Sequence, residues 1–98
     1  MVRQEILAAV KKMVTWHLLD TDAKVYLFGS WVRGEENQGS DIDIGIWYDN
    51  PLPSGTLSCL REALEESTIP YAVDLVDLTQ TNSDFRQAVL EEAELWKD

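Results

Sequence analysis

Two aspartates separated by one residue are the side chains in this sequence best suited to chemistry. Asp41 and Asp43 belong to a run, residues 41–46, in which isoleucines alternate with other residues. This period of two is typical of a strand with one apolar face, so the two carboxylates are expected to point the same way. Like charges at neighbouring positions of one face repel, and a divalent cation between them explains the arrangement best. The pattern therefore indicates a metal site, with Mg²⁺ as the expected ion.

A glycine and a serine stand upstream, and ten residues separate them from the first aspartate. The run before them, residues 24–28, is apolar, β-branched and aromatic, which predicts a strand that ends at Gly29. Ser30 then opens a short predicted helix over residues 30–35, whose first N–H groups lack partners within the helix. Together with the serine hydroxyl, these N–H groups would suit a phosphate.

A third acid, Asp74, lies in another strand-like run, residues 71–78, that follows Pro70. A carboxylate in the middle of a strand among apolar residues is costly to desolvate unless a metal ion or hydrogen bonds compensate it. Asp77 is an odd number of positions away and faces the opposite side, nearer the end of the strand, so we interpret it as a cap or turn residue. Asp74 is therefore the third candidate metal ligand.

These features together resemble the nucleotidyltransferase superfamily of the DNA polymerase β type, and its minimal prokaryotic members most closely. The resemblance rests on the glycine and serine, the ten-residue spacing, the paired aspartates and the strand aspartate downstream. Arg33 and Gly34 match the basic residue and second glycine that follow the turn in the family, and residues 40–44 match its Ser-Asp-Ile-Asp context. Trp31 and Val32 depart from the family, where a basic residue and an alanine are common. The resemblance covers residues 24–78.

For the acids, the resemblance implies two-metal phosphoryl chemistry. Asp41 and Asp43 would bridge two Mg²⁺ ions. Asp74 would bind the catalytic ion and orient or deprotonate the attacking hydroxyl. These three aspartates are therefore the expected catalytic and metal-binding residues.

For the turn, the resemblance implies that ATP is the substrate. The Gly29 backbone and the Ser30 hydroxyl would hold the β and γ phosphates, and Arg33 is a further candidate phosphate contact. Attack on the α-phosphate would expel pyrophosphate and leave AMP on a hydroxyl acceptor.

The acceptor is expected on a partner, because minimal members of this family are often paired with a small helical HEPN protein and act as antitoxins against it. The resemblance thus implies transfer of AMP to a HEPN-family toxin. Two alternatives stay open: a stoichiometric antitoxin that binds without catalysis, and a nucleotidyltransferase for a small molecule such as an aminoglycoside. The sequence also leaves the base preference and the oligomeric state open, a homo-oligomer included.

The composition of the chain narrows the range of expected partners further. The chain carries 8 basic and 18 acidic residues, a formal charge of −10, which repels phosphate backbones and disfavours a nucleic-acid substrate. Its start lacks the apolar stretch of a signal peptide, and no run of about 18 apolar residues occurs, so we expect a cytoplasmic protein without membrane contact.

Cys59 and His17 are the single cysteine and histidine, so neither a disulfide nor a zinc cluster can form within one chain. We expect Cys59 to be buried or half-buried in a helix.

The expected fold is of the α/β class, with residues 1–98 as one minimal nucleotidyltransferase domain. Helices and strands alternate in the order αβαβαβα, which predicts a small three-stranded sheet flanked by helices, and the resemblance implies that the sheet is mixed in direction. Predicted strands lie near residues 24–29, 41–48 and 71–78, and predicted helices lie near residues 3–19, 30–35 and 57–67 and from Ser83 onward. The last helix is predicted from an apolar stripe at helical spacing, formed by Phe85, Val89, Ala93 and Trp96.

Overall fold

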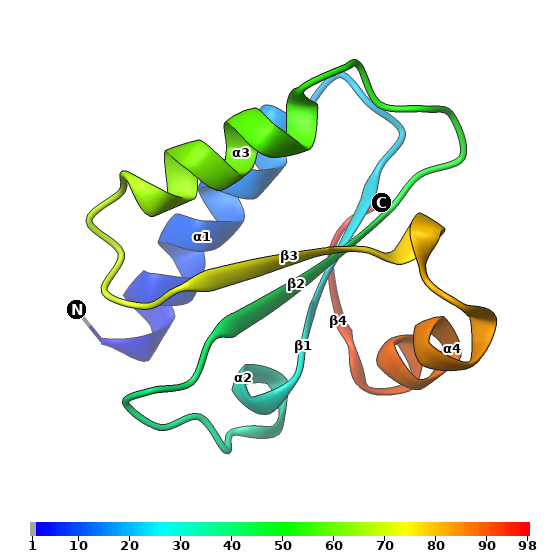
Figure 1. The fold of residues 1–98 in the computed structure, drawn as a ribbon. Helices are drawn as coiled ribbons and strands as arrows, with labels where there is room; N and C mark the ends of the chain where they lie inside the picture. The colour runs from blue at the N-terminus through cyan, green and yellow to red at the C-terminus, as the bar shows by residue number, and fades with distance from the viewer. Residues whose placement is uncertain (1) are drawn as a thin grey trace.

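A computed structural model describes residues 2–98 of the chain, and it confirms an α/β fold with a mixed sheet flanked by helices (Figure 1). Each predicted element is present, with ends that shift by a few residues. The elements are α1 (Arg3–His17), β1 (Lys24–Phe28), α2 (Ser30–Arg33), β2 (Ile42–Trp47), α3 (Thr56–Glu65), β3 (Val73–Asp77), the 3₁₀ helix η1 (Leu78–Gln80), α4 (Ser83–Glu92) and β4 (Glu94–Lys97).

The sheet has the strand order β3-β2-β1-β4. β1 pairs antiparallel with β2 and with β4, whereas β2 and β3 run parallel. The end of β1 and the starts of β2 and β3 therefore lie at one end of the sheet. Every candidate residue of the sequence motif is carried on or next to these strand ends.

The strand count and the last helix are where the prediction was wrong. The helix that starts at Ser83 ends at Glu92, because Ala93 has an extended backbone with φ −68° and ψ 148°. The chain then forms β4, whose residues pair with β1, for example Glu94 with Leu27. Without β4, one side of β1 would leave a row of unpaired backbone groups. The fourth strand satisfies them, and this tertiary pairing overrides the helical spacing of the apolar side chains.

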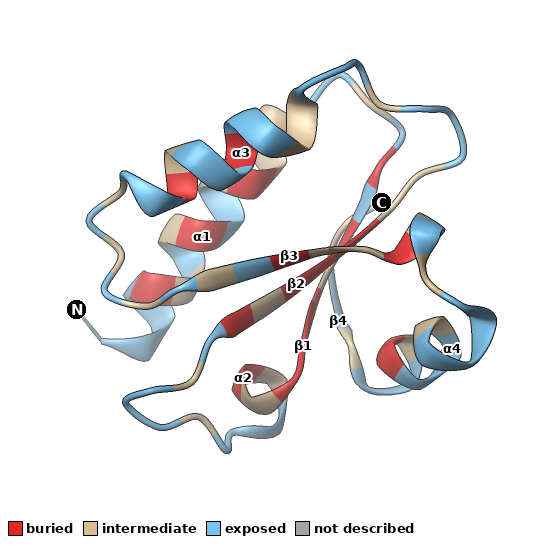
Figure 2. Cartoon of the chain, viewed as in Figure 1, coloured by how far each residue is buried: buried red, intermediate tan, exposed pale blue. Residues whose placement is uncertain are grey.

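Helices cover both faces of the sheet. α1 and α3 pack on one face against alternate strand residues such as Val25, Leu27 and Ile44. On the other face, Phe28 packs with Leu78 of η1 and Val89 of α4. Figure 2 shows buried residues concentrated in the central strands β1 and β2, and β4 has none. The isoleucines of β2 thus fill the core beneath α1 and α3, which turns the residues between them toward the α4 face.

Two smaller findings complete the fold. Cys59 lies on α3 as expected but is exposed, so the expectation of a buried or half-buried side chain was wrong. Among residues 2–98, no helix is both long and apolar enough to cross a membrane.

Candidate functional site

Two of the predicted carboxylates lie side by side in the sheet. Asp43 on β2 is directly opposite Asp74 on β3 in the parallel register, and Phe28 is opposite Asp43 on the other side. Asp43 is half-buried and Asp74 is exposed. Because residues 42, 44 and 46 of β2 fill the core beneath α1 and α3, Asp43 faces the other side of the sheet, where α4 packs. Phe28, Asp43 and Asp74 therefore form a row across β1, β2 and β3, and this row is the base of the candidate site.

The third predicted carboxylate, Asp41, precedes β2 and is exposed. Its charge acts on Asp43, whose pKa is raised above the ordinary value of 3.8. Burial is the main cause of the raised pKa, and the charges of Asp74 and Asp41 follow; Arg33 opposes the rise. The charges of Asp41 and Asp74 therefore both act on Asp43, as expected of carboxylates gathered at one place.

The donor set fits a hard divalent cation in its chemistry, since all its atoms are carboxylate oxygens. The side chains do not converge completely: across residues 2–98, no group of three or more His, Cys, Asp or Glu side chains is arranged to hold a metal ion. Asp41 and Asp74 are exposed, so their side chains are free to turn toward Asp43 without disturbing the core. Metal binding by these aspartates stays a prediction that the register of β2 and β3 makes feasible.

Gly29 places the turn after β1 directly against Asp43. Its backbone has φ 79° and ψ −154°, a region that is essentially reserved for glycine. A Cβ atom added at Gly29 would overlap the Asp43 Oδ2 atom. Only glycine therefore allows the turn to approach the carboxylate this closely.

The short helix α2 begins at Ser30, directly after this turn. The backbone N–H groups of Val32 and Arg33 donate to the Gly29 carbonyl at 3.1 and 3.3 Å. Gly34 ends the helix with a left-handed backbone at φ 71°, and its N–H donates to the Ser30 carbonyl. Ser30 and Arg33 thus lie at the start and end of one turn of helix beside the carboxylates, where a phosphate contact was predicted.

One residue at the site was not predicted. Glu92, the last residue of α4, accepts a hydrogen bond from the Gly29 N–H at 3.2 Å. Both of its carboxylate oxygens also accept from Arg33 Nη1, at 3.0 and 3.1 Å. Arg33 Nε makes a further ion pair with Glu35. The contact joins residues 59 positions apart, where α4 ends beside β1, so no local sequence pattern predicts it.

Asp77 lies outside the site, as predicted. Its side chain accepts the Thr79 N–H at 3.1 Å and so caps η1. It also accepts a hydrogen bond of 2.7 Å from the Tyr48 hydroxyl. Asp77 is therefore a structural acid.

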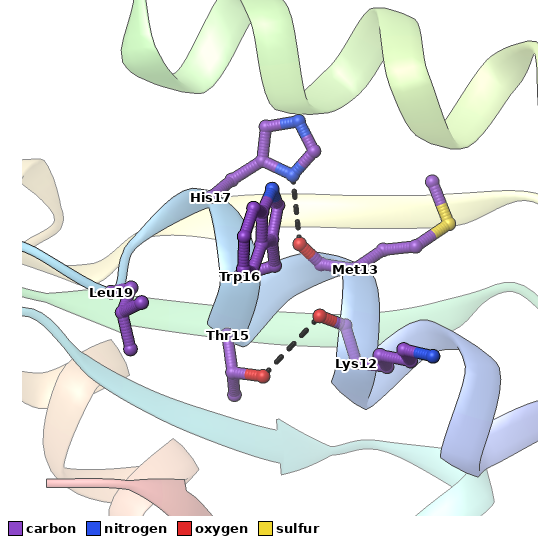
Figure 3. A pocket seen from close by; sticks show the side chains of 6 residues that line it. All are labelled: Lys12, Met13, Thr15, Trp16, His17 and Leu19. Carbon is purple, nitrogen blue, oxygen red and sulfur yellow. Dashed lines mark hydrogen bonds between the residues drawn. The ribbon is translucent and has the colours of Figure 1, made fainter.

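A largely apolar hollow of about 540 Å³ lies elsewhere, at the end of α1 (Figure 3). Its lining includes Trp16 and Leu19, whose exposed fractions are 71% and 61%. His17 is held there by a hydrogen bond from its Nδ1 to the Met13 carbonyl at 2.8 Å. The lining contains no carboxylate, so the hollow is separate from the candidate site.

Comparison with known proteins gives matches over nearly the whole chain. The model of the family described as Polymerase beta, Nucleotidyltransferase matches residues 18–97. A curated relative from Haemophilus influenzae, described as a probable protein adenylyltransferase, MntA, is 38% identical over 88 residues; the match covers 90% of this chain and 75% of the relative.

Two solved structures share the fold. A chain described as a putative minimal nucleotidyltransferase aligns with a TM-score of 0.77 and 26% identity, covering 96% of this chain and 95% of that one. A chain from a toxin-antitoxin crystallised with AMP-PNP aligns with a TM-score of 0.69 and 28% identity, covering 88% of this chain and 71% of the other.

Proposed function

The chain belongs to the polymerase β nucleotidyltransferase family, and from this premise we propose that it transfers AMP from ATP to a hydroxyl group of a partner protein, a HEPN-family toxin, and so acts as the antitoxin. The observation that carries this proposal is the pairing of Asp43 with Asp74 beside the Gly29 turn. It joins acids suited to metal ions with a turn suited to phosphate.

Asp41, Asp43 and Asp74 are the residues that would hold two Mg²⁺ ions. When bound, such ions would supply charge to stabilise the phosphate oxygens in the transition state. Asp74 is exposed at the edge of the site, where it would orient the acceptor hydroxyl and accept its proton. The Gly29 N–H and the Ser30 hydroxyl would hold the β and γ phosphates.

The proposed reaction forms one phosphorus–oxygen bond and breaks another. The acceptor oxygen forms a bond to the α-phosphorus, and the bond from that phosphorus to the bridging oxygen of pyrophosphate breaks. The hydroxyl proton passes to Asp74, and pyrophosphate leaves with the electron pair of the broken bond.

A protein acceptor is favoured by the relatives and by charge. The curated relative is described as a protein adenylyltransferase, and one structural neighbour comes from a toxin-antitoxin. The formal charge of −10 opposes nucleic acid and suits a basic protein surface. A partner that presents its hydroxyl to Asp74 would complete the site.

A second candidate function is a binding antitoxin that neutralises its partner without catalysis. The observation that favours it is the incomplete convergence of the carboxylates among the described residues. In this case the aspartates would be dispensable for neutralisation.

One experiment separates the two. The purified chain is incubated with α-labelled ATP, Mg²⁺ and a candidate HEPN partner, and label on the partner and pyrophosphate release are measured together with complex formation. Asp41→Asn and Asp74→Asn are compared with Glu62→Gln, which removes a charge from an exposed position of α3.

Label that appears with wild type and Glu62→Gln but not with the aspartate variants supports the adenylyltransferase. A stable, neutralising complex without label, unchanged by the aspartate substitutions, would favour the binding antitoxin.

A further inference from the structure

The carboxylate of Glu92 occupies the groups that were assigned to the nucleotide. It accepts the Gly29 N–H at 3.2 Å and two hydrogen bonds from Arg33 Nη1 at 3.0 and 3.1 Å. A carboxylate and a phosphate are both anions that accept hydrogen bonds from such donors. The structure therefore shows an internal anion where a ligand anion is expected.

The fold holds Glu92 in this place. Ala93 turns the chain from α4 into β4, and its N–H donates to the Val89 carbonyl at 3.0 Å. Glu94 then pairs with Leu27, two residues before Gly29. The end of α4 is thus fixed beside the end of β1, while the Glu92 side chain is able to change its rotamer.

The local helix does not favour an acid at this position. The last turn of a helix carries partial negative charge, and α4 has no basic residue there. Glu92 also adds negative charge near Asp43. Its contacts with Arg33 and the Gly29 N–H compensate for this placement.

We propose that Glu92 is an intramolecular competitor of the nucleotide, bound to Gly29 and Arg33 in the free protein and displaced when a nucleoside triphosphate binds. The inference rests on the proposed function, because it takes Gly29 as a phosphate contact and adds Arg33, the further candidate that the sequence predicts. Glu92 thus lowers the affinity of the free antitoxin for nucleotide, since only the fraction of molecules with Glu92 released is competent to bind.

The strength of the contact suits such a role. The Arg33 and Glu92 side chains are 47% and 34% exposed, and ion pairs at such positions are weak. A triphosphate carries more charge than one carboxylate, so it is able to replace Glu92. A weak pair corresponds to an expected change in affinity of about two- to fivefold when Glu92 is removed.

The test measures the Kd of ATP with Mg²⁺ by equilibrium dialysis at low ionic strength. Glu92→Gln removes the charge, and Glu92→Asp keeps the charge but shortens the reach to Gly29. Glu91→Gln is the matched control, because Glu91 is the exposed neighbour on α4 and carries the same charge. Thermal unfolding of each variant checks that the fold is kept.

We expect both Glu92 variants to bind ATP about two- to fivefold more tightly than wild type, and Glu91→Gln to change the Kd less. Equal affinities for Glu92→Gln and Glu91→Gln, in a wild type that binds ATP, would overturn this inference alone. Weaker binding by the Glu92 variants would also overturn it, since Glu92 would then help to hold the nucleotide. No ATP binding by any variant would overturn the proposed function together with the inference.

Discussion

Asp43 of β2 and Asp74 of β3 are direct neighbours in the parallel register, and the Gly29 turn closes over Asp43 from the other side. Such a pair of like charges is locally unfavourable. The half-buried position of Asp43 adds to the cost, because burial is the main cause of its raised pKa. The Asp43–Asp74 pair is therefore expected to lower the stability of the fold.

Replacing Asp43 by asparagine should stabilise the metal-free protein, because it removes the repulsion while the side chain keeps its size. We expect a gain of about 0.5 kcal/mol, or roughly 2 to 4 °C in Tm. Mg²⁺ should raise the Tm of wild type but not of Asp43→Asn, and AMP transfer should be lost. Thermal unfolding with and without Mg²⁺ measures the two Tm effects, and transfer of label from α-labelled ATP to the partner measures the loss of activity.

Asp77→Asn provides the control for this prediction, since Asp77 lies on β3 but caps η1. Its replacement should lower the Tm. If Asp43→Asn lowered the Tm as much as Asp77→Asn does, the Asp43 carboxylate would have favourable contacts beyond those in the structure. The prediction would then be wrong.

Gly29→Ala should be strongly destabilising, because the new Cβ would overlap Asp43 Oδ2 and the backbone conformation excludes side chains. We expect a loss of about 2 to 4 kcal/mol in the free energy of unfolding, measured by urea titration. Gly39→Ala is the matched control. Its Cβ would meet only Asn37 Oδ1, at 3.8 Å, so the expected change is within about 0.5 kcal/mol. Similar losses in the two variants would contradict the close approach of the turn.

The Tyr48 hydroxyl should stabilise the fold in a way that depends on pH. Its hydrogen bond to Asp77 raises the pKa of Tyr48 above the ordinary value of 10.0. The folded state thus favours the protonated phenol, so this stabilisation is fully present below pH 10.0 and is lost as the pH rises through the folded pKa. Tyr48→Phe should lower the Tm by a few degrees or less at neutral pH. The difference between the two proteins should shrink above pH 10.0; a difference that stays constant across this range would speak against the hydrogen bond.

Gly45→Ala should also destabilise the protein, for a packing reason. A Cβ at Gly45 would lie 2.7 Å from Leu78 Cδ1 and 3.1 Å from its Cγ, so the Leu78 side chain must move. We expect a cost of about 1 to 3 kcal/mol in unfolding by urea. In the double variant with Leu78→Ala, the new methyl group should fill part of the space left by Leu78. The loss in free energy of unfolding of the double variant should therefore be smaller than the sum of the losses of the two single variants. Strict additivity would show that the two positions do not meet.

Periodicity predicted most of the fold because the strands and helices carry clear patterns. The isoleucines of β2 alternate in the sequence and fill the core, as the prediction required. β4 was not predicted, because Ala93 and Trp96 continue the helical spacing of the apolar residues in α4. In addition, neither glycine nor proline follows Glu92 to stop the helix. Pairing with β1 decides the outcome there, and single-sequence patterns do not reveal which strands pair.

The same reason divides the site into what the sequence predicts and what it does not. The local pattern marked Asp41, Asp43 and Asp74 as candidate acids and Gly29 as a turn. The register that places Asp43 opposite Asp74 depends on strand order, which the sequence left open. Glu92 contacts Arg33 across 59 residues of sequence, because α4 packs beside β1, so no local pattern could mark it.

The position of β1 between β2 and β4 also affects how the chain folds during its synthesis. Along the chain β1 precedes β2, β3 and β4, so a nascent chain carries β1 with one side unpaired until residues 94–97 have emerged from the ribosome. During that period neither the complete sheet nor the Glu92 contact exists. The nascent chain therefore keeps this side of β1 open to strand-to-strand aggregation until β4 emerges, and pairing of β4 then covers it beside the Glu92 contact.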